Sequence, residues 1–115
     1  MYKRQVLAIT SIAVRQPIPH LILSNTARAG VTGFLKTLAG EVAPDGVTVN
    51  SLQPGFHDTE RLRELGATDA SVIPVGHLGD PDRFGRIAAF LCSDAAGFLT
   101  GAAIPVDGGA SGGLQ

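Results

Sequence analysis

The sequence predicts an α/β fold in which helices cover a three-stranded parallel sheet. Three short runs of apolar and β-branched residues alternate with two longer segments whose apolar residues recur at helical spacing. Strands that alternate with helices are typical of parallel sheets, because parallel neighbours need a long crossover connection. The length of 115 residues is that of one domain. We therefore expect a single partial domain over residues 1–115, with three strands, two long helices and a lid-like insertion.

The first strand and the first long helix are predicted from an apolar run and an apolar stripe. Residues 6–9 are expected to form a strand that is buried on both faces of the sheet. Pro17 and Pro19 predict a loop after this strand, because proline disrupts both regular periods. A helix is expected over residues 24–42, and its apolar stripe consists of Ala27, Val31, Phe34, Leu35, Leu38 and Val42.

The second strand follows a turn at residues 44–46 and consists of the β-branched stretch 47–52. Pro54 and Gly55 end this strand. Residues 56–79 are rich in Gly, Asp and His and contain one short helical stretch, over 59–65. We interpret this segment as a variable, lid-like excursion outside the core.

The last two elements complete the alternating pattern. Asp80 is expected to cap a second long helix, in which Pro81 occupies the first position. Its apolar stripe contains Phe84, Ile87, Ala88 and Leu91. A short apolar run over 102–106 predicts the third strand, and Asp-Gly-Gly at 107–109 turns the chain away from it.

The composition excludes several classes of function. Nine basic and ten acidic residues leave a net charge of −1, so we expect no nucleic-acid partner. The apolar runs are too short for a membrane span or a signal peptide. Cys92 is the single cysteine and cannot form an internal disulfide, which favours a cytoplasmic protein. Its side chain is expected to be small and buried. His20, His57 and His77 lack the spacing of metal ligands, so no metal site is predicted.

A ligand site is expected where the three strands end, because open parallel sheets bind ligands beyond their carboxyl ends. The segments there are residues 10–11, 53–55 and 107–109. Ser24 and Arg28 are four residues apart and share one face at the start of the first long helix. From spacing alone, the simpler interpretation is a capping serine and a solvated arginine.

Four stretches of the chain resemble the short-chain dehydrogenase/reductase family in its order and spacing. The resemblance is closest to the 3-oxoacyl-carrier-protein reductases and covers nearly the whole chain. The stretches are Arg-Ala-Gly-Val at 28–31, Glu-Val-Ala-Pro-Asp-Gly-Val-Thr-Val-Asn at 41–50, Pro-Gly-Phe-His-Asp-Thr at 54–59, and Leu-Thr-Gly through Pro-Val-Asp-Gly-Gly at 99–109.

The resemblance implies the C-terminal part of a Rossmann-type doubly wound sheet. It also implies hydride transfer between NAD or NADP and a small-molecule carbonyl or alcohol, in a homo-oligomer. Ser11 matches the family's catalytic serine, whereas Ser24 and Arg28 occupy the positions of its catalytic tyrosine and lysine. Arg28 is also implied to contact the cofactor, as are four residues that match the nicotinamide-binding segment: Pro54, Gly55, His57 and Thr59.

The chain departs from the family at the proton donor and at the phosphate-binding turn. Its single tyrosine is Tyr2, ahead of the first strand, and a serine hydroxyl such as that of Ser24 is a much weaker acid than a phenol. His20, four residues before Ser24, is an alternative donor, although an exposed loop histidine is the simpler interpretation.

The family's glycine-rich turn does not precede the first strand. We therefore expect a truncated oxidoreductase that binds NAD(P) weakly by itself and self-associates through its unpaired sheet edge. The main alternative is a non-catalytic scaffold that retains the family's assembly surfaces. A small independent binding domain is a third interpretation.

Overall fold

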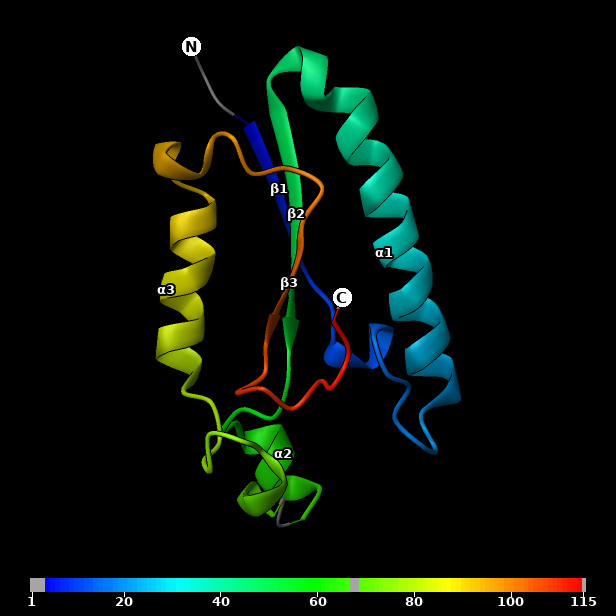
Figure 1. Cartoon of the computed structure of the whole chain (residues 1–115), viewed down its shortest axis with the longest axis vertical. Coiled ribbons are helices and arrows are strands. Elements are labelled where there is room, and N and C mark those ends of the chain that lie inside the picture. Colours follow the sequence, from blue (N-terminus) through cyan, green and yellow to red (C-terminus); the bar gives the residue numbers. More distant parts are fainter. Residues whose placement is uncertain (1–3, 67–68, 115) are drawn as a thin grey trace.

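Three parallel strands form the centre of the molecule, with one long helix on each side of them (Figure 1). This computed structural model describes residues 4–66 and 69–114. The strands are β1 (Arg4–Ile9), β2 (Val47–Pro54) and β3 (Ala103–Val106), in the order β1-β2-β3. Both pairings are parallel, with Ala8 beside Ser51 and Ser51 beside Ala103. The predicted α/β class and the element order are therefore confirmed.

The helices are α1 (Ile22–Val42), α2 (Glu60–Glu64) and α3 (Pro81–Leu91). Within the described ranges, four single-turn 3₁₀ helices connect these elements. They are η1 (Ile12–Val14), η2 (Ala43–Asp45), η3 (Ala70–Val72) and η4 (Asp94–Ala96). Within the described residues, no helix is long and apolar enough to cross a membrane.

Strand β2 carries the core, because its successive side chains point to opposite faces of the sheet. On one face Val49 packs with Leu35 and Ala39 of α1. On the other face Leu52, which is completely buried, packs with Leu91 and with Ala96 of η4. The sheet is thus covered by α1 on one face and by α3 on the other.

Strand β1 is less buried than the sequence predicted. The strand is present and extends from Arg4, but Val6 and Ile9 are 39% and 51% exposed. The expectation that both faces of this strand are buried is therefore wrong. The reason is its position, since β1 lies at the edge of the described sheet and pairs only with β2.

The apolar stripe of α1 is also only partly buried. Leu35 is buried, and Leu38 and Val42 pack against the same cluster. Val31 and Phe34 belong to the predicted stripe but are 44% and 62% exposed. The described sheet is only three strands wide, so it covers a narrower band of the helix than the stripe spans.

Helix α3 begins as predicted. The Asp80 carboxylate accepts a hydrogen bond from the backbone N–H of Asp82, 2.9 Å away, and Pro81 follows the cap as the first helical residue. Cys92 is exposed, which corrects the expectation of a buried cysteine. It comes one position after Leu91, and one position rotates a side chain by roughly 100° around a helix, away from the sheet.

The segment 56–79 is tied to the end of β3. The backbone N–H of Val75 donates to the carbonyl of Gly108 at 3.2 Å. Gly108 has φ +63°, and a Cβ there would lie 2.6 Å from a methyl group of Val75. Ile73 in the same segment is only 3% exposed, so this part of the excursion belongs to the packed structure.

Candidate functional site

Arg28 connects the first turns of α1 to the end of β1. Its Nε donates a hydrogen bond to Ser24 Oγ at 3.1 Å, and its Nη1 donates to the carbonyl oxygen of Thr10 at 2.6 Å. Thr10 is buried and is itself fixed by hydrogen bonds to the carbonyl of Leu52. The guanidinium is half-buried and has three further N–H groups. Arg28 is therefore held in place between the helix and the sheet.

Ser11 follows Thr10 directly and lies beside this contact in the chain. Its hydroxyl oxygen accepts a hydrogen bond from the backbone N–H of Ala13 at 3.1 Å and caps η1. This cap uses the oxygen as an acceptor, so the hydroxyl hydrogen can still be donated. His20 lies in the following loop, is exposed, and has φ +67°.

A pocket of about 350 Å³ lies beyond the carboxyl ends of β1 and β2. Its lining includes four of the predicted cofactor residues: Pro54, Gly55, His57 and Thr59. Ile9, Phe84 and two leucines of the α2 region, Leu62 and Leu65, form much of its apolar wall. Its size is within the range of small-ligand and cofactor sites.

His57 forms one wall of this pocket, and contacts with three residues hold it in place. Its Nδ1 lies 3.2 Å from the carbonyl of Gly55, and its ring meets that of Phe84 edge to face at 5.1 Å between centroids. Gly79 pairs with His57 in a short parallel bridge, and a Cβ on Gly79 would lie 2.6 Å from His57 Nε2. Only glycine at position 79 leaves room for the imidazole ring.

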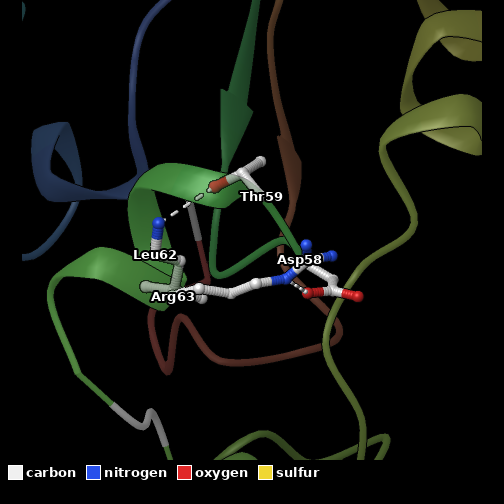
Figure 2. A network of polar contacts seen from close by, with 4 residues as sticks. All are labelled: Asp58, Thr59, Leu62 and Arg63. Atoms are coloured by element: carbon white, nitrogen blue, oxygen red, sulfur yellow. Dashed lines mark hydrogen bonds and ion pairs between the residues drawn. The ribbon is translucent and has the colours of Figure 1, made fainter.

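Thr59 caps a helix as well as lining the pocket. Its hydroxyl accepts the backbone N–H of Leu62 at 3.3 Å and caps α2, as Figure 2 shows. Beside it, Arg63 Nε donates to Asp58 Oδ1 at 2.9 Å. The hydrogen bond from Arg63, together with its charge, lowers the pKa of Asp58 below the usual value of an aspartate. Both side chains are largely exposed.

Gly55 is required by packing. A Cβ there would lie 2.8 Å from the Cβ of Asp107, which follows β3. The backbone N–H of Gly55 donates to the carbonyl of Val106 at 3.0 Å. The strand ends expected to meet, at residues 53–55 and 107–109, are therefore in direct contact.

The predicted residues fall into two groups. Arg28 and Ser24 are hydrogen-bonded, and Arg28 also binds the residue before Ser11. Pro54, Gly55, His57 and Thr59 line the pocket, whose described lining does not include the first group. Tyr2 lies outside the described residues.

Several contributors to this region were not found by sequence reasoning. Thr10 binds Arg28 through its backbone carbonyl, which no side-chain pattern reveals. Phe84 was expected only as part of an apolar helix stripe, but its ring also lines the pocket. Gly79 is one of several glycines in the segment 56–79, and no sequence pattern distinguishes it from the others. The structure explains why glycine is needed at this position, because the His57 ring lies directly against it.

The parallel sheet, covered by helices on both faces and with polar groups at its strand ends, defines an α/β protein of the Rossmann type. A family model described as "Enoyl-(Acyl carrier protein) reductase" matches residues 3–111. The chain therefore belongs to the short-chain dehydrogenase/reductase family of oxidoreductases. Within that family it resembles the C-terminal part of the 3-oxoacyl-acyl-carrier-protein reductases.

Individual relatives agree with this assignment. The chain is 43% identical over 110 residues to an acetoacetyl-CoA reductase of Rhizobium meliloti, covering 91% of this chain and 46% of the relative. A 3-oxoacyl-acyl-carrier-protein reductase of Pseudomonas aeruginosa is 42% identical over 87 residues, covering 72% of this chain and 35% of the relative. The chain thus spans less than half the length of these curated relatives.

Solved structures likewise match nearly all of this chain and less than half of their own length. An NADPH-bound short-chain oxidoreductase from Pseudomonas aeruginosa, described as containing an atypical catalytic center, superposes with a TM-score of 0.86. It is 32% identical and covers 96% of this chain and 47% of that one. A 3-ketoacyl-acyl-carrier-protein reductase from Brucella melitensis complexed with NADH has a TM-score of 0.85, 35% identity, and coverage of 95% and 45%.

Proposed function

We propose that this chain is the C-terminal part of an enzyme that transfers a hydride between NAD(P) and a small carbonyl or alcohol substrate. In this proposal Ser11, Ser24 and Arg28 form the catalytic centre. The observation that carries it is the contact of Arg28 with both Ser24 Oγ and the carbonyl of Thr10. The resemblance assigns Arg28 to the family's catalytic-lysine position, and this contact holds its guanidinium in place. The family's oxidoreductase assignment supports the reaction class.

The chemistry assigned to these side chains follows from their charge and hydrogen-bonding capacity. Arg28 stays protonated at every physiological pH, so it presents a fixed positive charge. A positive charge and hydroxyl donors stabilise negative charge that develops on a substrate oxygen during reduction. Ser11 donates a hydrogen bond to that oxygen, and Arg28 orients the hydroxyl of Ser24. In this proposal the Ser24 hydroxyl passes a proton to the substrate oxygen as the hydride arrives, and it regains a proton from solvent. Arg28 thereby takes over the electrostatic part of the role of a tyrosine–lysine pair.

The pocket beyond β2 fits a nicotinamide ring, which supplies the hydride when NAD(P)H is bound. It is mostly apolar, and about 350 Å³ accommodates a flat heterocycle together with its amide. Pro54, His57 and Thr59 would hold the ring and the amide. Gly55 supports the pocket indirectly, because it allows β2 and Asp107 to approach each other.

A second candidate function is a non-catalytic scaffold. It is favoured by the apolar surface of α1, where Ile22, Leu23 and Phe34 are 77%, 83% and 62% exposed. Large apolar side chains exposed on one helix suit a protein–protein contact. In both functions the protein forms a homo-oligomer, and the low cysteine content favours a cytoplasmic location.

A chimera separates the two functions. The chain replaces the matching part of the Pseudomonas aeruginosa reductase to which it is 42% identical, and NADPH consumption is followed with acetoacetyl-CoA as the carbonyl substrate. We expect reductase activity that falls roughly 100-fold in Arg28→Gln, because one charged stabiliser is lost. Arg86→Gln on exposed α3 is the matched control and leaves the rate unchanged. A folded chimera that binds NADPH but reduces nothing would support the scaffold.

The same chimera tests the unusual proton donor. Ser24→Tyr combined with Arg28→Lys restores a phenol and an ammonium, and we expect carbonyl reduction to increase. Each single change has a smaller effect, because the two residues act as a unit. An unchanged rate in the double variant, with NADPH binding intact, would show that another group donates the proton.

A further inference from the structure

A separate groove lies on the α1 side of the sheet and shares no lining residue with the proposed nicotinamide pocket. It is a groove of about 250 Å³ between α1, β2 and the stretch that enters β3. Two cations, Arg15 of the loop after η1 and Lys36 of α1, contribute to its walls, and its described lining includes no Asp or Glu. The groove is therefore positively charged.

Arg15 is a half-buried guanidinium whose described partners are both neutral. Its Nε donates to the side-chain oxygen of buried Gln53, and its Nη2 donates to the carbonyl of Ala103 at 2.7 Å. Among the described residues it forms no ion pair. Fully buried arginines are almost always paired with an anion, and Arg15 is partly withdrawn from water with no such partner among the described residues. Three of its five N–H groups, two on Nη1 and one on Nη2, have no described partner. These groups lie at the tip of the guanidinium, which is the part that binds an oxyanion through two parallel hydrogen bonds.

Lys36 is held close to the same stretch of chain. Its Nζ donates to the carbonyl of Gly101 at 2.9 Å, only two residues before the carbonyl that Arg15 binds. Two residues of extended chain span at most about 7 Å, so both cations are attached to one short stretch. Gly101 has φ +71°, and a Cβ there would lie 3.2 Å from Nζ, so glycine permits this approach.

We propose that this groove binds a small oxyanion, a phosphate or carboxylate group, between Arg15 and Lys36. The guanidinium fork binds the anion directly, and the ammonium contributes a second positive charge. The hydroxyl of Ser51, which also lines the groove, is available as an additional donor. The site is separate from the proposed catalytic centre and does not depend on the proposed function.

The test is a titration of the 115-residue chain, followed by backbone amide NMR shifts at constant ionic strength. Inorganic phosphate and succinate are used in separate arms, to distinguish a phosphate from a carboxylate ligand, and chloride is the reference. We expect saturable shifts that cluster at residues 36, 51 and 101–103. Lys36→Gln should weaken the affinity roughly tenfold, the equivalent of one charge-assisted contact. Lys36 is exposed on the helix surface, so this variant keeps the fold.

Arg15→Gln should abolish saturation, and its amide spectrum reports whether Gln53 and β3 keep their positions. Arg86→Gln removes the same charge from an exposed site outside the described groove and should leave binding unchanged. Equal weakening in Arg86→Gln, or linear shifts spread over the surface, would overturn the proposal, because both indicate general charge screening. If light scattering shows that the chain is a dimer and the ligand-induced shifts are absent in that dimer, the proposal is also overturned. The groove would then be assigned to contact with a second copy of the chain.

Discussion

Replacing Gly79 by alanine should destabilise the protein through a single steric conflict. The added Cβ would lie 2.6 Å from Nε2 and 2.9 Å from Cγ of the His57 ring. Van der Waals contacts between such atoms begin at about 3.5 Å, so either the His57 ring or the backbone of Gly79 must move by roughly 1 Å. The backbone is held on both sides of the ring, because Asp58 N–H donates to the Gly79 carbonyl at 2.8 Å and Gly79 N–H donates to the Phe56 carbonyl at 2.9 Å.

The imidazole must therefore give way, which removes its contacts with the Gly55 carbonyl and the Phe84 ring. Overpacking of this kind costs about 1–3 kcal/mol in the free energy of unfolding. The measurement is urea-induced unfolding followed by circular dichroism, with the slope compared between variants. Gly85→Ala in α3 is the matched control, since a Cβ there meets nothing within 4 Å, and alanine should stabilise the helix by about 0.5–1 kcal/mol.

A double-mutant cycle identifies the cause. In a His57→Ala background the ring is absent, so Gly79→Ala should cost less than about 0.5 kcal/mol. A cost that is unchanged in this background would refute the steric argument. So would a Gly79→Ala variant as stable as the parent protein.

Two further predictions concern the charge pair beside the pocket and the core. The pKa of Asp58 is lower in the folded than in the unfolded chain, so its contribution to stability is present above about pH 4 and is lost as the pH falls through the folded pKa. An NMR titration should show this pKa rising in Arg63→Gln, and an unchanged value would contradict the assigned cause. Leu52→Ala should lower the free energy of unfolding by about 2–5 kcal/mol, because this side chain is completely buried. Leu65→Ala, at a side chain that is 72% exposed, should change it by less than about 0.5 kcal/mol in the same urea experiment, and equal losses would place Leu52 outside the core.

The local signals in the sequence predicted the elements and their order. Helix α3 begins at the predicted cap because Asp80 and Pro81 act within one turn of the chain. The β-branched stretch at 47–52 became the buried centre of the sheet. A short helical stretch was expected from residue 59, and the Thr59 hydroxyl caps α2 there. These features depend on residues close together in sequence, so the sequence alone determined them.

Burial and contacts over long sequence separations were decided by the tertiary structure. Val6 and Phe34 carry the same apolar signal as buried residues, yet both are exposed, because the described sheet ends at β1 and is narrow beneath α1. Spacing placed Ser24 and Arg28 on one helix face, but the third partner is the Thr10 carbonyl, a backbone atom with no sequence signature.

Arg15 had no predicted role, and its partners Gln53 and Ala103 lie 38 and 88 residues away in the chain. Helical or strand periodicity reports which face a residue occupies, and it carries no information about which distant segment meets that face. The packing of η1 and α1 over β2 and β3 brings these groups together. That packing is a property of the folded chain as a whole.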